Sequence, residues 1–454
     1  MKQDLDLFIK ITEKLLEAEI SDPVLKPIPV EQVLTDLDLQ LQDEPAMDGD
    51  FARTLEQLVL TTPRTATKLF FNQLFGGRQS RAVLGELLSV MLNNSMYTYK
   101  VGGPHIVMEK QILEKFAALV GYDDNAHGTL APGGSMTNLM GMLMARDWKD
   151  PQARYDGVTQ KMTAYTSEAC HYSVFKNATF AGIGRSQVRS IATDDHGRMD
   201  VQALEEAIKK DVEAGHTPFM INATAGTTVI GAFDPIKEIS AIAKQYDLWL
   251  HVDGAYCGSV LFSEKYKHLV EGSELADSFT LNAHKMLGTP LACSLITVKD
   301  KKHLYYSFSQ EASYLYQTAN DEYNPGKISL QCGRRNDALK FWTLWKTIGT
   351  NGVAAAVDHQ FDLARYAKEY VKNHPDYTLY NDDDTIAACF NYKGIDPKEL
   401  CNKLYEQGEI MVGYGKFRDQ EFVRLITVNY DNTTAEIDRF FAVMEQFVAD
   451  HNMA

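Results

Sequence analysis

Residues 248–254 read Leu-Trp-Leu-His-Val-Asp-Gly, and residues 278–285 read Ser-Phe-Thr-Leu-Asn-Ala-His-Lys. Each is a short apolar run that leads to an ionisable side chain, Asp253 in the first and Lys285 in the second. Other short apolar runs alternate with helical stretches, which predicts a mostly parallel sheet covered on both faces, an α/β fold. Ligands of such sheets bind outside the carboxyl ends of the strands, so we expect Asp253 and Lys285 at one crevice.

A carboxylate and a primary amine in one crevice can hold the two decisive ends of a pyridoxal phosphate ring. The lysine forms a Schiff base with the cofactor, and the aspartate keeps the ring nitrogen protonated. Taken alone, a lysine after an apolar run is more often a solvated strand end, and an aspartate there is more often a turn residue or a helix cap. Further motifs in the same chain decide between these interpretations.

Residues 131–138, Ala-Pro-Gly-Gly-Ser-Met-Thr-Asn, precede an apolar-periodic stretch. Gly134 and Ser135 would offer backbone N–H groups, a hydroxyl and the positive end of a helix to a phosphate. On its own the segment is equally well an ordinary helix start. His171, within Ser167-Glu-Ala-Cys-His-Tyr-Ser, supplies a flat ring that can stack on a conjugated cofactor, although an isolated histidine is more often a buried structural residue.

The ordered motifs PGGSMTN, SEACHYS, ATAGTTVIGAFDP, HVDGAY, NAHKMLGTPLACS, QCGRRND and FVRLI resemble the group II pyridoxal-phosphate-dependent amino-acid decarboxylases. The similarity begins near Phe70 and is greatest to the acidic-substrate branch, which contains the glutamate, cysteine sulfinate and aspartate decarboxylases. The resemblance implies a fold type I enzyme with a seven-stranded, mostly parallel sheet in a large domain. It also implies a homodimer with active sites at the subunit boundary.

Site residues follow from the resemblance position by position. The resemblance implies that Lys285 carries the cofactor, that His171 stacks on it, and that Tyr314 of a mobile loop donates a proton to the substrate carbon. The cofactor-binding set is Gly134, Ser135, His171, Thr224, Asp253, Ala255, His284 and Lys285. Gln73 and Arg424 match residues that hold substrate carboxylates.

Phe75, Ser95 and Tyr97 occupy positions that line the substrate side-chain pocket in the relatives. A phenylalanine shortens that pocket, which favours aspartate or cysteine sulfinate, with glutamate or 2,4-diaminobutyrate as alternatives. An aminotransferase or another lyase on this fold also stays open, as does a non-enzymatic relative that either binds the cofactor or lacks it. The chain departs from the family pattern at Lys100, at Asn282-Ala-His284 and at Gly254, and these changes bear on the substrate rather than on the cofactor.

The chain has 454 residues, with 45 Lys and Arg against 61 Asp and Glu and a formal charge of −16. This charge disfavours nucleic acid and anionic membrane as partners. No run of about 18 apolar residues predicts a membrane span, and the amino terminus lacks the pattern of a secretory signal. The 6 cysteines have no metal-ligand spacing, so we expect no metal, reduced thiols and a cytoplasmic protein.

Three regions are expected along the chain. Residues 1–60 form a helical arm, residues 61–345 the large cofactor-binding domain, and residues 346–454 a small carboxyl-terminal α/β domain. The aromatic-rich segment 305–327 has weak periodicity, which favours either a lid over the substrate or an ordinary surface excursion.

Overall fold

The computed structural model describes residues 1–312, 316, 321–381 and 384–453. The chain forms two compact units, here called the larger and the smaller unit. The larger unit comprises Arg78–Ala364 and Asn381–Ala387; the smaller comprises Met1–Gly77, Arg365–Tyr380 and Ala388–Ala454. The division into an arm and two domains at residues 60 and 345 stays a prediction. Tyr314, the expected proton donor, lies outside the described residues.

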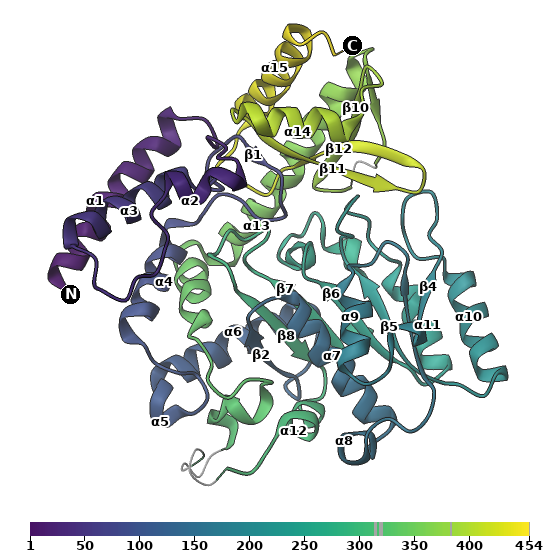
Figure 1. Cartoon of the computed structure of the whole chain (residues 1–454). Helices are drawn as coiled ribbons and strands as arrows, with labels where there is room; N and C mark the ends of the chain where they lie inside the picture. Colours follow the sequence, from purple (N-terminus) through teal and green to yellow (C-terminus); the bar gives the residue numbers. More distant parts are fainter. Residues whose placement is uncertain (313–315, 317–320, 382–383, 454) are drawn as a thin grey trace. The chain divides into compact units, whose positions relative to one another are not determined.

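A seven-stranded sheet runs through the larger unit in the order β2-β8-β7-β6-β5-β3-β4 (Figure 1). Only β8 runs antiparallel to its neighbours β2 and β7, and the remaining neighbours are parallel. The predicted fold class is therefore confirmed. The strands are β2 (His127–Ala131), β3 (Met162–Ser167), β4 (Val188–Ile191), β5 (Thr217–Thr224), β6 (Trp249–Gly254), β7 (Ser278–Asn282) and β8 (Ser294–Val298).

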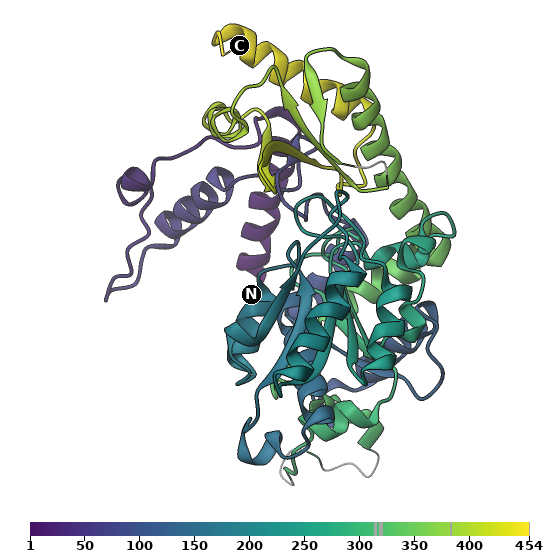
Figure 2. The same ribbon diagram turned by 90° about the vertical axis from the view of Figure 1, so that its right-hand side faces the viewer.

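Every residue of β3, β6, β7 and β8 is buried. Because successive side chains of a strand point to opposite faces, continuous burial means that both faces of this sheet are covered. The helices that pack against its strands are α6 (Pro104–Val120), α7 (Gly134–Lys149), α9 (Ser173–Phe180), α10 (Val201–Glu213) and α11 (Ile236–Gln245) (Figures 1 and 2). The larger unit also contains α4 (Ser80–Leu92), α5 (Tyr99–Gly102), α8 (Ala153–Asp156) and α12 (Lys302–Phe308).

Helix α13 (Asp337–Asn373) begins in the larger unit and ends in the smaller one. Its helical geometry is interrupted at Gly349, where φ is 68° and ψ is 175°. A residue with a side chain rarely adopts a positive φ, so glycine suits this break between two helical segments.

The smaller unit contains a five-stranded sheet in the order β1-β11-β12-β10-β9. The strands are β1 (Phe70–Phe71), β9 (Tyr377–Leu379), β10 (Ala387–Tyr392), β11 (Met411–Phe417) and β12 (Gln420–Ile426), and the helices are α1 (Lys2–Ser21), α2 (Val33–Asp36), α3 (Asp48–Thr61), α14 (Pro397–Gln407) and α15 (Thr434–Asp450). Phe70 pairs with Met411 on β11, and Gly413 of β11 faces Arg424 of β12. This pairing brings the segment after β1 close to Arg424, although hundreds of residues separate them along the chain.

Among the described residues, no helix is long and apolar enough to cross a membrane. Within the same residues, no group of three or more His, Cys, Asp or Glu side chains is arranged to hold a metal ion.

Candidate active site

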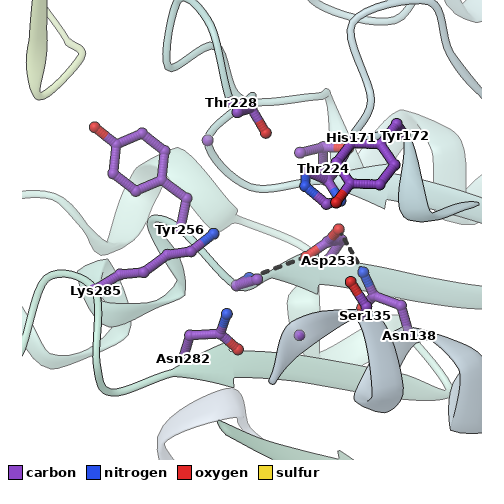
Figure 3. A pocket seen from close by; sticks show the side chains of 13 residues that line it. Ser135, Asn138, His171, Tyr172, Thr224, Thr228, Asp253, Tyr256, Asn282 and Lys285 are labelled. Atoms are coloured by element: carbon purple, nitrogen blue, oxygen red, sulfur yellow. Dashed lines mark hydrogen bonds between the residues drawn. The ribbon is translucent and has the colours of Figure 1, made fainter. Parts of the chain in front are cut away.

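A cavity of about 230 Å³ opens at the carboxyl ends of β3, β5, β6 and β7 in the larger unit (Figure 3). These four strands are parallel neighbours, so their carboxyl ends meet at one edge of the sheet. We call this the strand-end cavity. It is lined by Gly134, Ser135, Asn138, His171, Tyr172, Thr224, Gly226, Thr228, Asp253, Ala255, Tyr256, Asn282 and Lys285.

The first turn of α7 forms one wall of the strand-end cavity. Its N-cap, Gly133, has a φ of 119°, and no side chain caps the helix. A Cβ atom on Gly134 would lie 2.8 Å from Asn282 Nδ2 and 3.1 Å from Ala255 Cβ. Only glycine therefore lets the chain approach this closely. The backbone N–H groups of Gly134 and Ser135, at the positive end of the helix, are suited to binding an anion.

Asp253 lies near the end of β6 with 4% of its surface exposed. Its Oδ2 accepts a hydrogen bond from Asn138 Nδ2 at 2.7 Å, and its Oδ1 accepts one from the backbone N–H of Ala255 at 3.1 Å. Both oxygens of the carboxylate are therefore held in fixed positions. A carboxylate held this way can form an ion pair with a protonated ring nitrogen.

Lys285 lies in the turn that follows β7, where its backbone N–H bonds to the Asn282 carbonyl at 3.1 Å. Its Nζ lies 5.8 Å from the centre of the Tyr256 ring. Figure 3 shows Lys285 and Asp253 extending into the strand-end cavity from different strand ends. The carboxylate and the amine, 32 positions apart in the sequence, thus share one cavity.

His171 lies between β3 and α9, and its ring packs on Tyr172 with centroids 4.3 Å apart. Its Nδ1 accepts from the backbone N–H of Ser173 at 3.3 Å and lies 2.8 Å from Ser173 Oγ. Burial lowers the pKa of His171, an effect that Asp253 opposes and Lys285 reinforces. The ring is therefore neutral at physiological pH and can stack on a flat ligand.

Two buried polar atoms at the strand-end cavity, Thr224 Oγ1 and Asn282 Oδ1, have no hydrogen-bond partner among the described residues. Buried polar atoms normally have partners, so a polar ligand is expected to supply them. Together with the helix N-terminus, a carboxylate and a primary amine, these atoms form a donor and acceptor set that fits pyridoxal phosphate.

His284, a member of the predicted cofactor-binding set, is not among the residues that line the strand-end cavity. Its Nδ1 lies 3.0 Å from both the backbone N and the backbone O of Cys293. Burial lowers the pKa of His284 to about 4, so its ring is neutral. These two contacts hold the His284 ring against the backbone of Cys293, the residue just before β8.

Gln73 and Arg424, the predicted carboxylate-binding pair, line a second cavity, of about 270 Å³, in the smaller unit. The Arg424 Nη2 donates to the backbone carbonyl of Asn72 at 3.4 Å, and Gln73 Nε2 donates to the Asn72 side chain. The structure therefore brings these two residues together. We call this space the arginine cavity.

Phe75, Ser95 and Tyr97 are the predicted residues of the substrate side-chain pocket. Phe75 packs on Phe70 in the smaller unit, with ring centroids 6.0 Å apart. Ser95 Oγ accepts from the backbone N–H of Arg334 at 3.1 Å, and the Tyr97 carbonyl accepts from Gly326 at 2.9 Å, both in the larger unit. Their role in substrate choice stays a prediction.

Several residues that line the strand-end cavity had no predicted role. They are Asn138, Tyr172, Gly226, Thr228, Tyr256 and Asn282. A signal existed for Asn138, because it follows Ser135 by three positions and residues three apart lie on the same face of a helix. No comparable periodicity marks Thr228 or Tyr256, which lie outside the regular strands and helices.

Comparison with known proteins gives a consistent result. The conserved domain of pyridoxal-dependent decarboxylases matches residues 30–393. Human cysteine sulfinic acid decarboxylase is 33% identical over 440 residues, covering 91% of this chain and 89% of the relative. Acidic amino acid decarboxylase GADL1 of Bos taurus is 35% identical over 453 residues, covering 94% and 86%.

Solved structures agree with this similarity. The crystal structure of mouse CSAD superposes with a TM-score of 0.92 at 30% identity, covering 98% of this chain and 99% of the other. The structure of Oryza sativa TDC with PLP and tryptamine has a TM-score of 0.91 at 21% identity, covering 100% and 99%. The second comparison shows a shared fold.

Proposed function

The chain belongs to the pyridoxal-dependent decarboxylase family, and on that premise we propose that it removes the α-carboxyl group of a short acidic amino acid. Aspartate, which gives β-alanine, and cysteine sulfinate, which gives hypotaurine, are the favoured substrates. The observation that carries the proposal is the meeting of Asp253, Lys285 and the N-terminus of α7 in one cavity. The names of the relatives, cysteine sulfinic acid decarboxylase and acidic amino acid decarboxylase, support the acidic substrate class.

The residues of the strand-end cavity, together with His284, can each be assigned to a group of the cofactor. Gly134 and Ser135 would bind the phosphate, Asp253 the ring nitrogen, and Lys285 the aldehyde carbon through its amine. His171 and Ala255 would contact the two faces of the ring, Thr224 a ring substituent, and His284 would support the phosphate side. Bound pyridoxal phosphate supplies a cationic ring that accepts the electron pair left when carbon dioxide departs.

The protein groups bind, orient and move protons. Asp253 would form an ion pair that keeps the ring nitrogen protonated, and neutral His171 would add no positive charge beside it. Arg424 would hold a substrate carboxylate by a bidentate contact, with Gln73 as a further donor. Tyr314 would return the proton to the substrate carbon.

Substrate length would be set by Phe75, with Ser95 and Tyr97 as further residues of the pocket. A phenylalanine leaves less room than a small residue, and one methylene changes discrimination by about 1–3 kcal/mol. A four-carbon acid or its sulfinate analogue would therefore be preferred over glutamate.

A product assay tests the proposal. Purified protein with pyridoxal phosphate is incubated with equal amounts of aspartate, cysteine sulfinate, glutamate and 2,4-diaminobutyrate, and the amines and carbon dioxide are quantified. We expect β-alanine or hypotaurine in excess over the other amines, in equal amount to the carbon dioxide. Keto acids without carbon dioxide would instead identify an aminotransferase, and mainly γ-aminobutyrate would identify glutamate as the substrate.

We also propose that two copies of the chain form a homodimer through α4. This helix exposes several large apolar side chains, namely Leu84, Leu87, Leu88, Val90, Met91 and Leu92. A cluster of exposed apolar residues on one helix indicates a protein interface, and a second copy is the simplest symmetric occupant. Leu88→Glu should convert a dimer into a monomer by light scattering, whereas Leu275→Glu, at an exposed apolar position outside α4, should leave the mass unchanged.

A cytoplasmic location is proposed from the thiols. All 6 cysteines are free, four of them buried. Proteins of oxidising compartments more often form disulfides. Fractionation of the source cells tests this location.

A further inference from the structure

A chain of hydrogen bonds leads away from Asp253 into the core of the larger unit. Asn138 on α7 donates to Asp253 at 2.7 Å (Figure 3), and Asn138 Oδ1 lies 3.0 Å from His251 Nε2. The other nitrogen of that ring, Nδ1, lies 2.8 Å from Ser278 Oγ. Trp249 Nε1 donates to the same Ser278 oxygen at 2.9 Å. Four consecutive links therefore join the carboxylate to an indole, and we call them the Asp253 relay.

All members of the Asp253 relay are buried. Trp249, His251 and Ser278 are at most 1% exposed, and Asn138 and Asp253 are 3% and 4% exposed. Water therefore does not replace any of these bonds, and a broken link would leave a buried polar atom without a partner. Such an atom costs about 1–3 kcal/mol, which makes the arrangement of this group well defined.

The direction of each bond can be assigned from the carboxylate outward. An ionised Asp253 accepts only, so Asn138 turns its NH₂ group toward it and its oxygen toward His251. The His251 Nε2 must then carry the proton. Burial lowers the pKa of His251 to about 4, so the ring is neutral and its Nδ1 has a lone pair. Ser278 consequently donates to that Nδ1.

Trp249 completes the sequence, because an indole N–H can only donate and Ser278 Oγ has a lone pair left to accept it. Every N–H or O–H in the Asp253 relay thus points toward Asp253. Hydrogen bonds aligned in one direction polarise one another, which strengthens the last donor, and a bond to a charged acceptor benefits most.

A glycine in α7, Gly141, leaves room for the His251 ring. A Cβ atom on Gly141 would lie 2.8 Å from His251 Nδ1 and 3.0 Å from its Cε1. Gly141 and Asn138 are three residues apart, so one face of α7 both makes room for the His251 ring and supplies the amide that joins it to Asp253.

We propose that Asn138, His251 and Ser278 are positioning residues that hold the Asp253 carboxylate correctly oriented for the ring nitrogen of the cofactor. This inference rests on the proposed function, in which Asp253 pairs with that nitrogen. The relay residues act through Asp253, and of these three only Asn138 lines the strand-end cavity.

The test compares two ligands that differ only at the ring nitrogen. The cofactor-free full chain is titrated by equilibrium dialysis with pyridoxal phosphate and with its analogue that has C–H in place of the ring nitrogen. The readout is the ratio of the two dissociation constants, which we call the nitrogen selectivity. A general packing defect weakens both ligands equally and leaves the nitrogen selectivity unchanged.

We expect Asn138→Leu to lower the nitrogen selectivity by about tenfold or more, since it removes a bond to a charged group. Ser278→Ala, two links further away, should lower it by about threefold, the value of a neutral hydrogen bond. Thr280→Val is the matched control, because Thr280 lies on the same strand and face as Ser278, is fully buried, and its Oγ1 has no partner among the described residues. Its nitrogen selectivity should equal that of the unmodified chain.

Asp253→Asn separates this inference from the proposed function. If Asp253→Asn loses the nitrogen selectivity while Asn138→Leu and Ser278→Ala keep it, the relay is overturned and the role of Asp253 stands. If Asp253→Asn also keeps it, the pairing of Asp253 with the ring nitrogen fails, and the relay fails with it. Should Asn138→Leu not fold, the smaller change in Ser278→Ala decides the outcome alone.

Discussion

In the proposed function Asp253 binds the cofactor and Arg424 binds the substrate, and the surroundings of these two ionic groups differ. Asp253 is 4% exposed, sits within a parallel sheet and receives two hydrogen bonds of 2.7 and 3.1 Å. Arg424 is half-buried on β12 of the smaller sheet, and its Nη2 bond to Asn72 measures 3.4 Å. The first group is buried with both carboxylate oxygens hydrogen-bonded, whereas the second is half-buried at the wall of the arginine cavity.

This difference fits the two tasks. A cofactor ring has one shape, so a rigid carboxylate loses no free energy in arranging itself around it. Substrates differ in length, and an arginine at the wall of an open cavity can adapt to them. Changes at Asp253 should therefore slow the chemical reaction, while changes at Arg424 should alter substrate affinity.

The largest effect is expected from Asp253→Asn. Removing one partner of a buried ion pair costs about 3–5 kcal/mol, so kcat/KM should fall by about 10² to 10⁴. Steady-state kinetics at saturating cofactor measure this change. Asp200→Asn is the control, because Asp200 caps α10 and asparagine caps a helix equally well. If the activity of Asp253→Asn stayed within a factor of two of that of the unmodified chain, Asp253 would not have the proposed role in the reaction.

The stability of the protein at acid pH should depend on His251, which is linked to Asp253 through Asn138. Burial lowers the pKa of His251 from 6.5 to about 4, so the unfolded chain binds this proton more readily than the folded one. Neutral His251 therefore contributes its full stabilisation above pH 6.5, and this stabilisation is lost as the pH falls toward 4. At pH 5 the loss amounts to about 2 kcal/mol of the free energy of unfolding. Denaturant unfolding at about pH 7.5 and pH 5 should show this loss, and His251→Gln should reduce it. An identical loss in His251→Gln would contradict the assignment.

Arg424→Lys should act on the substrate rather than on the cofactor. Lysine keeps the charge but loses the planar fork, which is worth about 1.5–3 kcal/mol for a bond to a carboxylate, so KM should rise by about 10- to 100-fold. Cofactor affinity should stay unchanged. Arg439→Lys, at an exposed position of the same unit, is the control. A fall in cofactor affinity equal to the rise in KM would contradict the assignment of Arg424 to substrate binding alone.

Phe75→Ala should give the smallest effect and the most specific one. A longer pocket accepts one more methylene, so the ratio of kcat/KM for glutamate to that for aspartate should increase by about tenfold. Competition assays with both acids measure the ratio directly. An unchanged ratio would show that Phe75 does not set substrate length.

The same contrast explains what the sequence predicts well. Asp253 and Lys285 follow apolar runs, and the carboxyl ends of parallel strands meet at one edge, so their common cavity could be anticipated. The role of Thr224 comes only from the family resemblance. Gly134 and Ser135 could be placed at a helix start by the glycines and the periodic residues after them. These inferences depend on local patterns, and the parallel sheet supplies the rest of the geometry.

Other features depend on contacts that no local pattern records. The antiparallel direction of β8 cannot be inferred, because Ser294-Leu-Ile-Thr-Val is equally apolar in either direction. His251 looks like any polar residue within a strand until Gly141 and Asn138 are packed against it. Phe75 and Tyr97 lie in different compact units, and their roles require a bound substrate to be tested.

The central claim is that Lys285 and Asp253 hold opposite ends of one cofactor ring. The most direct measurement is reduction of the cofactor-loaded protein with borohydride, which fixes the covalent link, followed by peptide mass spectrometry. The account predicts a single pyridoxyl phosphate group, carried by the peptide that contains Lys285 and absent from Lys285→Ala. A label on another lysine, or an unchanged label in Lys285→Ala, would contradict it.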